Sequence, residues 1–176
     1  SPIYGGNVGA ICRAMANMGL SDLTLAAPRA LNLRETRMLA CAAWHLYERR
    51  RECATLAAAV ADCGLIVGAT ARLGLYRAHS ETPREVAPRL LAAARRGKVA
   101  LVFGREDCGL SNEELALCTR IVQIPSAPEY TSLNLSQAVM LCAYELFTAS
   151  GTFVPSAEKS PAAPSALRER MLAVWH

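Results

Sequence analysis

Residues 101–115 read LVFGREDCGLSNEEL, and this stretch indicates the class of the fold. The apolar run at 99–103 is typical of a central parallel strand, because both faces of such a strand are buried. Ser111 followed by Glu114 forms a capping-box pattern, which predicts that a helix begins directly after Ser111. The stretch therefore predicts a strand, a turn and a helix in succession, which is the repeating unit of an α/β fold.

The turn inside this unit carries a carboxylate between two glycines. Gly104 and Gly109 flank Glu106, and glycine lets the backbone approach a ligand closely while the acid points into a site. A simple turn between a strand and a helix would not need both glycines. We therefore interpret the turn as part of a ligand-binding site.

The same alternation extends through the rest of the chain. Short apolar runs predict strands at about residues 23–27, 65–68, 99–103 and 121–124. Helical periodicity and capping signals predict helices at about residues 9–19, 34–46, 55–62, 82–96, 133–147 and 167–174. The alternation indicates an α/β fold with a mostly parallel sheet flanked by helices. Ligands of such sheets bind beyond the carboxyl ends of the strands, so we expect the chemistry in the loops that follow the strands.

Length and composition fit one soluble domain. The chain has 176 residues, 52% of them hydrophobic, which is enough for a single domain with a core. No stretch approaches the roughly 18 to 20 apolar residues that a membrane-spanning helix needs, and no secretory signal is recognisable. We therefore expect a cytoplasmic protein without membrane association. The seven cysteines are odd in number and lack C-x-x-C spacing, so we interpret them as reduced and not as zinc ligands.

Positive charge is modest in sum but clustered along the chain. The formal net charge is +4, and basic residues gather at Arg34 and Arg37, at 49–51 and at 95–98. Such clusters permit a partner that carries phosphate groups. Runs of arginine are also common on solvated helix faces, so the pattern alone does not establish a nucleic-acid partner.

Residues 5–19, GGNVGAICRAMANMG, place an amide and a guanidinium near the start of one helix. The glycine spacing is not G-x-G-x-x-G, and no acidic ribose-binding residue follows a second strand, which argues against an NAD-binding Rossmann domain. Asn7 stands six residues before Arg13, where free backbone N–H groups also favour an anion. The segment fits phosphate binding, or simply a capping asparagine and a surface arginine.

Residues 124–139, IPSAPEYTSLNLSQAV, form the third unusual segment. A predicted strand is followed by a proline-rich loop and then by Ser132, Asn134 and Ser136 at alternate positions. Any one of these three side chains could cap the helix that follows. Their clustering after a strand end also fits a binding loop.

Together the three segments resemble the SpoU family of RNA ribose methyltransferases, within the SPOUT superfamily. The matches are Asn7 to Arg13 for family motif one, Gly104, Glu106 and Gly109 for motif two, and Ser132, Leu133 and Asn134 for motif three. GATAR at 68–72 resembles the element of the branch that methylates position 32 of the tRNA anticodon loop. The resemblance covers about residues 1–150.

The resemblance implies a fold and a cofactor. Members of this family form a deep trefoil knot near the C-terminus, an exception to the rule that chains are unknotted, and work as homodimers. The knot is expected to bring the loops together into a slot for S-adenosylmethionine, with no metal. The residues implied to line that slot are Ala69, Thr70, Ala71, Gly104, Ile124, Thr131, Ser132 and Leu133.

The resemblance also implies catalytic roles in methyl transfer to a ribose 2′-OH of tRNA. Arg13 is the main catalytic residue by this likeness. Because a guanidinium holds its proton firmly, we expect Arg13 to stabilise the developing alkoxide and grip the adjacent phosphate, and not to act as a base. Asn7, Glu106, Ser132 and Asn134 are expected to orient Arg13 and the ribose, and Arg13 is expected to face the cofactor of the other subunit.

Two departures from the family pattern lead to expectations about domain organisation. Family members usually have a β-strand directly before motif one, and here Ser1 and Pro2 stand at that point, so we expect a missing or trimmed strand. Residues 1–150 are expected to form the methyltransferase domain. Residues 151–176 are expected to be a linker and the start of a C-terminal helical extension that binds tRNA.

Two alternatives to methylation at position 32 stay open. The same chemistry on another tRNA position or on ribosomal RNA is the main one, because the GATAR element favours position 32 without proving it. A catalytically silent RNA-binding module on the same fold is the other, and the presence of Arg13, Glu106 and Asn134 argues against it.

Overall fold

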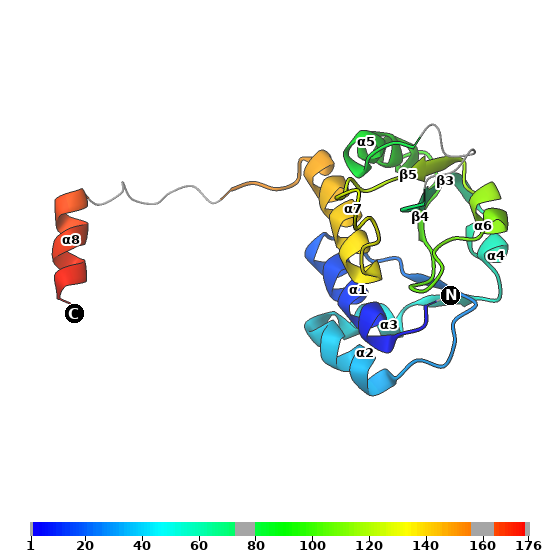
Figure 1. Ribbon diagram of the computed structural model, residues 1–176, viewed down its shortest axis with the longest axis horizontal. Helices are drawn as coiled ribbons and strands as arrows, with labels where there is room; N and C mark the ends of the chain where they lie inside the picture. Colours follow the sequence, from blue (N-terminus) through cyan, green and yellow to red (C-terminus); the bar gives the residue numbers. More distant parts are fainter. Residues whose placement is uncertain (1, 73–79, 156–163, 175–176) are drawn as a thin grey trace.

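The computed structural model describes residues 2–72, 80–155 and 164–174. Its elements, in chain order, are α1 (Gly5–Asn17), β1 (Thr24–Ala26), α2 (Leu33–Ala40), the short 3-10 helix η1 (Cys41–Ala43), α3 (Trp44–Glu48), β2 (Arg51–Cys53), α4 (Leu56–Val60), β3 (Cys63–Ala69), α5 (Pro83–Ala94), β4 (Lys98–Phe103), α6 (Asn112–Ala116), β5 (Arg120–Val122), α7 (Leu135–Ser150) and α8 (Ser165–Ala173). The expected alternation of strands and helices is confirmed (Figure 1).

The described strands pair only in parallel. One sheet has the order β4-β3-β5, and β1 pairs with β2 in a second, two-stranded sheet. The central strand β3 is the most buried, and Val67 on β3 and Val122 on β5 are fully shielded from solvent. The expectation of an α/β fold with parallel strand pairing is thereby confirmed, but the described strands form two sheets where a single sheet was expected.

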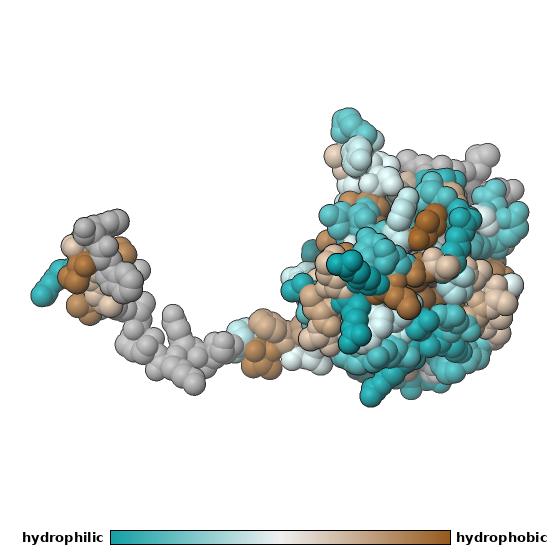
Figure 2. All heavy atoms as spheres, turned by 90° about the horizontal axis from the view of Figure 1, so that it is seen from below, coloured by the Kyte–Doolittle hydropathy of each residue, from teal (hydrophilic) through white to brown (hydrophobic). Residues whose placement is uncertain are grey.

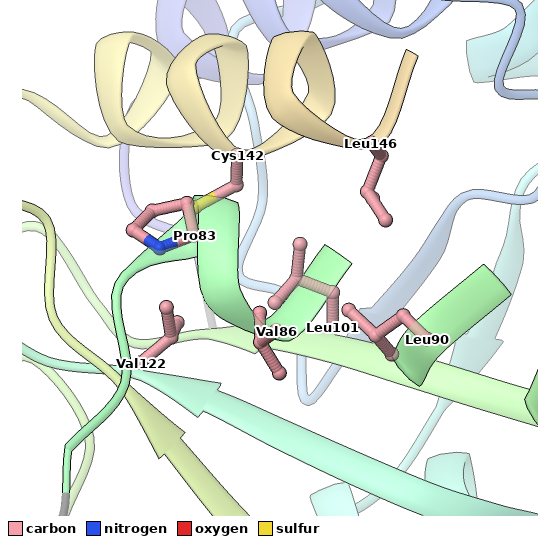
Figure 3. Close-up of a pocket in the computed structure, with 7 residues that line it drawn as sticks. All are labelled: Pro83, Val86, Leu90, Leu101, Val122, Cys142 and Leu146. Atoms are coloured by element: carbon pink, nitrogen blue, oxygen red, sulfur yellow. The ribbon is translucent and has the colours of Figure 1, made fainter. Parts of the chain in front are cut away.

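Helices α5 and α7 cover one side of the three-stranded sheet. Figure 3 shows Cys142 and Leu146 of α7 pointing toward Val86 and Leu90 of α5 and toward Leu101 on β4. Burial of an aliphatic side chain of this size stabilises a fold by about 1.5 to 3 kcal/mol. This layer is packed core, and it holds α7 against the strands whose ends carry the site.

Helices α1 and α2 approach each other closely because glycine faces the contact. A Cβ atom at Gly9 would lie 2.2 Å from the carbonyl oxygen of Thr36, and one at Gly5 would lie 2.5 Å from Oγ1 of the same residue. The Thr36 hydroxyl is fully buried and donates to the carbonyl of Asn32 at 2.8 Å. The glycines of the first motif therefore serve helix packing.

A helix start, an interruption within a helix and an additional strand differ from the expectations. The first helix begins at Gly5 and not near Gly9. The helix expected at 34–46 is interrupted at Cys41, where φ is +50° and ψ is −129°. The short strand β2 was not expected, because it has the sequence Arg-Glu-Cys with no apolar alternation and is recognisable only by its pairing with β1.

Some expectations concern parts of the chain that the structure does not describe. Ser1, where the expected first strand would end, and most of the expected linker, residues 156–163, lie outside the described residues. The expected C-terminal helix is confirmed as α8. Within the described residues, none of the helices combines the length and the apolar character needed to cross a membrane.

Candidate functional site

A cavity of about 630 Å³ opens at the carboxyl ends of the strands. Its walls come from the residues after β3, the turn after β4 and the loop between β5 and α7. Phe103, Leu135 and Ala138 give it apolar walls. Pockets of roughly 300 to 1,000 Å³ at this edge of a parallel sheet are where such folds bind small ligands.

The cavity gathers the residues that the sequence analysis assigned to a cofactor. Its lining includes all eight of them, Ala69, Thr70, Ala71, Gly104, Ile124, Thr131, Ser132 and Leu133. They come from three segments that are far apart in the sequence. Their proximity is a finding, and their role in cofactor binding stays a prediction.

Gly104 makes the turn after β4 tight. A Cβ atom there would lie 2.0 Å from the carbonyl carbon of Gly109 and 2.2 Å from the backbone nitrogen of Leu110. Arg105 and Gly109 exchange two backbone hydrogen bonds of 2.8 and 3.2 Å, and Gly109 has a φ of +68°. Glycine is therefore needed at both ends of the turn that carries Glu106.

Glu106 ties this turn to the start of the chain. Its carboxylate accepts hydrogen bonds from the backbone N–H of Ile3 at 3.0 Å and of Tyr4 at 3.4 Å. It also accepts from Nδ2 of Asn7 at 3.1 Å. A carboxylate accepts at both oxygens, so one acidic side chain holds the entry to α1 at the cavity.

Asn7 and Asn134 continue this connection to the third segment. Nδ2 of Asn134 donates to Oδ1 of Asn7 at 3.0 Å. Oδ1 of Asn134 accepts from the backbone N–H of Ser136 at 2.9 Å and from its hydroxyl at 2.7 Å, which caps α7. Glu106, Asn7 and Asn134 thus form one hydrogen-bonded chain through all three motifs, which we call the Glu–Asn–Asn chain.

Arg13 lies apart from this chain of contacts. Its side chain is exposed, does not line the cavity, and donates from Nη1 toward Sγ of Cys41 at 3.8 Å. Ser132 lines the cavity with an exposed side chain. Within one chain, the structure brings Asn7, Glu106 and Asn134 together but not Arg13.

The cavity also has charged residues that the sequence analysis did not single out. Arg105 binds Asp107 through two hydrogen bonds of 3.0 and 2.6 Å, and this guanidinium holds the pKa of the Asp107 carboxyl below its usual range. The Asp107 carboxylate in turn raises the pKa of the neighbouring Cys108 thiol. Arg72, the last residue of GATAR, lines the cavity as well. Its position in the GATAR element was the signal in the sequence that could have identified Arg72 as a cavity residue.

Two buried cysteines, Cys12 and Cys142, and the half-buried Cys118 are poor nucleophiles. Burial raises the pKa of Cys12 to about 11, of Cys118 to about 11 and of Cys142 to about 12. The thiolate is the reactive form, so these thiols are inert at neutral pH.

Among the described residues, no group of three or more His, Cys, Asp or Glu is placed to hold a metal ion.

These features define an α/β domain with a ligand site at the carboxyl edge of a parallel sheet. Over residues 1–144 the sequence matches the SpoU rRNA Methylase family. The chain belongs to that family.

Curated relatives extend the comparison. A Haemophilus influenzae protein named "Uncharacterized tRNA/rRNA methyltransferase" is 41% identical over 143 residues, which cover 81% of this chain and 58% of the relative. The Escherichia coli K12 protein "tRNA (cytidine/uridine-2'-O-)-methyltransferase TrmJ" is 42% identical over 141 residues, which cover 80% of this chain and 57% of the relative. The chain therefore spans less than two thirds of the length of these relatives.

A solved structure shares the fold. The structure of a probable methylase family protein from Haemophilus influenzae superposes with a TM-score of 0.80 at 35% sequence identity. The superposition covers 99% of this chain and 74% of that one.

Proposed function

We propose that this chain transfers a methyl group from S-adenosylmethionine to a ribose 2′-OH of tRNA, at cytidine or uridine 32 of the anticodon loop. The observation that carries the proposal is the Glu–Asn–Asn chain beside a cavity in which all eight predicted cofactor residues meet. Membership of a methylase family and the name of the E. coli relative support the same activity.

The cavity fits the proposed cofactor. Its volume of about 630 Å³ lies in the range of small-molecule sites. Phe103, Ile124, Leu133 and Leu135 offer apolar surface for an adenine, and Gly104 and Gly109 of the tight turn also line the space. When bound, S-adenosylmethionine would supply a methyl group on a positively charged sulfur; the ribose oxygen would take this methyl as its bond to sulfur breaks, S-adenosylhomocysteine would leave as a neutral thioether, and the hydroxyl proton would pass to solvent.

The side chains of the protein orient the reacting groups and stabilise negative charge. A guanidinium is a permanent cation with donors and no acceptor, so the proposed role of Arg13 is to stabilise negative charge on the ribose oxygen and to hold a neighbouring phosphate. Glu106 and the two asparagines fix the start of α1, the helix that carries Arg13. Placement of the reacting groups accounts for much of the rate in such a displacement.

A homodimer completes the proposed site. Arg13 contacts Cys41 in its own chain and stands outside the cavity, so a second copy is proposed to present its Arg13 to the cofactor. Exposed apolar side chains on α7, Leu141 and Tyr144, are candidates for the contact between copies.

The knot and the domain division are part of the proposal. The family likeness implies that the part of the chain with α7, which packs on both α1 and α5, forms a trefoil knot. Pulling on the two ends should then give a final length shorter than the roughly 3.3 to 3.6 Å per residue of an unknotted chain. A full extension would contradict the knot.

Residues 1–150 are proposed as the methyltransferase domain and residues 151–176 as the linker and start of a tRNA-binding extension. A chain that ends at Gly151 should keep its affinity for S-adenosylmethionine and lose affinity for tRNA. Unchanged tRNA affinity would remove this role from the extension.

We propose the cytoplasm as the place of action, where the seven free cysteines stay reduced.

Substitution of Arg13 by alanine tests the activity. We expect the rate of methyl transfer to whole tRNA to fall by at least about 100-fold, the effect of removing one donor to a developing oxyanion. The affinity for S-adenosylmethionine, measured by calorimetry, should stay within about twofold, because the eight residues proposed to hold the cofactor do not include Arg13. A wild-type rate would exclude Arg13 from the reaction.

Mapping the methylated ribose separates position 32 from another tRNA position or ribosomal RNA.

Mixing two inactive variants tests the shared site. Arg13→Ala removes the arginine, and Ala71→Trp fills the cavity that Ala71 lines. If Arg13 serves the cavity of the other copy, mixed dimers regain one complete site, and a random mixture should recover about a quarter of the wild-type activity. A mixture as inactive as its components would show that each site uses its own Arg13.

A further inference from the structure

Helix α2 presents two arginines without acidic partners. Arg34 and Arg37 are three residues apart, so they lie on the same side of the helix. Both are exposed, and neither forms an ion pair with any residue of the described ranges. The guanidinium of Arg37 lies 5.5 Å from the centre of the Trp44 ring, which steadies its position without neutralising its charge.

Several basic residues elsewhere in the fold are paired with carboxylates. The pairs are Arg50 with Glu52, Arg84 with Glu145, Arg89 and Arg120 with Glu81, Lys98 with Asp62 and Arg105 with Asp107. Arg34 and Arg37 belong to none of these pairs, so the charge on this face of α2 is not neutralised by a neighbouring carboxylate of the described residues.

These two arginines share a surface with Arg13. Cys41 directly follows α2, and its sulfur is the atom that Nη1 of Arg13 approaches. Helices α1 and α2 are in close contact along their length. The carboxylate that α2 carries, Glu35, is half-buried against Gly6 of α1. We call Arg13, Arg34 and Arg37 the α1–α2 arginine face.

Figure 2 views the molecule from the side on which α2 lies in Figure 1. Hydrophilic residues form large areas of the folded domain on this side, and apolar residues lie between them. The exposed apolar residues of α2 itself are Leu33, Met38 and Leu39. A surface with arginines and little acidic charge is better suited to bind a polyanion than to pack against the apolar surface of another protein.

We propose that Arg34 and Arg37 bind backbone phosphates of the RNA on one side of the ribose that Arg13 contacts. The inference rests on the proposed function and names a substrate-binding surface for it. The two residues are about 4.5 Å apart along the helix axis, and their long side chains can reach phosphates of neighbouring nucleotides. Arginine matches the geometry of a phosphate group, and each neutralised phosphate releases bound counterions. The contacts therefore add affinity and salt dependence and leave the reaction itself to Arg13.

Salt titration of tRNA binding tests this surface in the full chain. The test variant is Arg34→Gln with Arg37→Gln. The matched control is Arg95→Gln with Arg96→Gln, two exposed arginines beyond the end of α5 that also form no ion pair within the described ranges. A third variant, Arg34→Lys with Arg37→Lys, keeps the charge.

For the test variant we expect the slope of log affinity against log salt to fall in magnitude by about 1.5, since each lost phosphate contact contributes about 0.7 to 0.9. The control should keep the wild-type slope, and the lysine variant should keep most of it. Binding of S-adenosylmethionine and the oligomeric state should be the same in all variants. An unchanged slope, an equal loss in the control or a change of oligomeric state in the test variant would overturn the inference.

The outcomes also separate this inference from the proposed function. Methyl transfer by the wild type together with an unchanged slope in the test variant would refute the arginine face alone. A wild type that binds tRNA with the expected loss in the test variant, but transfers no methyl group, would refute the proposed reaction and leave the RNA surface supported.

Discussion

Nδ2 of Asn134 lies 3.0 Å from Oδ1 of Asn7, although 127 positions separate the two residues in the sequence. The other side of the Asn7 amide donates to Glu106. An amide has one acceptor oxygen and one donor nitrogen, so Asn7 is fixed from both sides. The first turn of α7 and the first turn of α1 are thereby held in one arrangement.

Asn134 has two functions that substitution can separate. Aspartate keeps the oxygen that caps α7 but lacks the donor to Asn7, whereas alanine lacks both. We expect Asn134→Ala to lower the free energy of unfolding by about 1 kcal/mol from loss of the cap, and Asn134→Asp to change it less. Both variants should lose methyl transfer. Denaturant unfolding and single-turnover assays measure the two effects, and an active Asn134→Asp variant would show that the bond to Asn7 is dispensable.

Gly104 leaves no room for a side chain. A Cβ atom would lie within 2.0 Å of backbone atoms of Gly109, which cannot move aside as a flexible side chain would. We expect Gly104→Ala to disrupt the turn, with a loss of stability of more than about 2 kcal/mol and of cofactor affinity. Gly97→Ala is the control, because no atom of the described residues lies within 4 Å of its added methyl group. Similar melting temperatures for the two variants would contradict the tightness of this turn.

Cys41 adopts a backbone conformation that disfavours side chains. Its φ of +50° with ψ of −129° belongs to a region that glycine occupies at little cost. We expect Cys41→Gly to be more stable than Cys41→Ala by about 1 to 3 kcal/mol, since both lose the sulfur and only glycine relieves the strain. Thermal unfolding gives the comparison. Equal stability would mean that the backbone at this position carries no strain.

Cys108 offers a pH-dependent probe of the cavity. The Asp107 carboxylate raises the pKa of this thiol, so the reactive thiolate appears only at higher pH. Asp107→Asn should shift the curve of alkylation rate against pH to lower pH and raise the rate at pH 8. Glu113→Gln, which removes an acid from α6 instead, should leave the curve in place.

Because Cys108 lines the cavity, bound S-adenosylmethionine should slow its alkylation, while the half-buried Cys53 outside the cavity should react as before. Peptide mapping by mass spectrometry resolves the two sites. Equal rates with and without S-adenosylmethionine would argue against this cavity as the cofactor site.

Elements set by local signals could be predicted from the sequence. The capping boxes at Thr82 with Glu85 and at Ser111 with Glu114 are both formed, and α5 and α6 begin where these patterns indicate. The short strand β2 could not be predicted, because it depends on pairing with β1 and not on its own residues. The interruption of the helix at Cys41 could not be predicted either, because a cysteine in the sequence does not indicate a positive φ.

The candidate site divides in the same way. The family likeness selected eight residues that the fold brings to one cavity. It did not indicate the pairing of Arg105 with Asp107, the bond between Asn7 and Asn134 or the contact of Arg13 with Cys41. Each of these depends on how the loops and helices come together in space, which spacing along the chain does not determine.

The missing side chain at Gly9 has a mechanical consequence. With the backbone of α1 directly against Thr36, the two helices cannot slide past each other without a clash. Arg13 and the arginines of α2 therefore stand at a set separation before any substrate arrives. If the proposed α1–α2 arginine face binds RNA, an RNA whose phosphates match that spacing would be held without the entropic cost of ordering the helices, and one that does not match would have to distort itself.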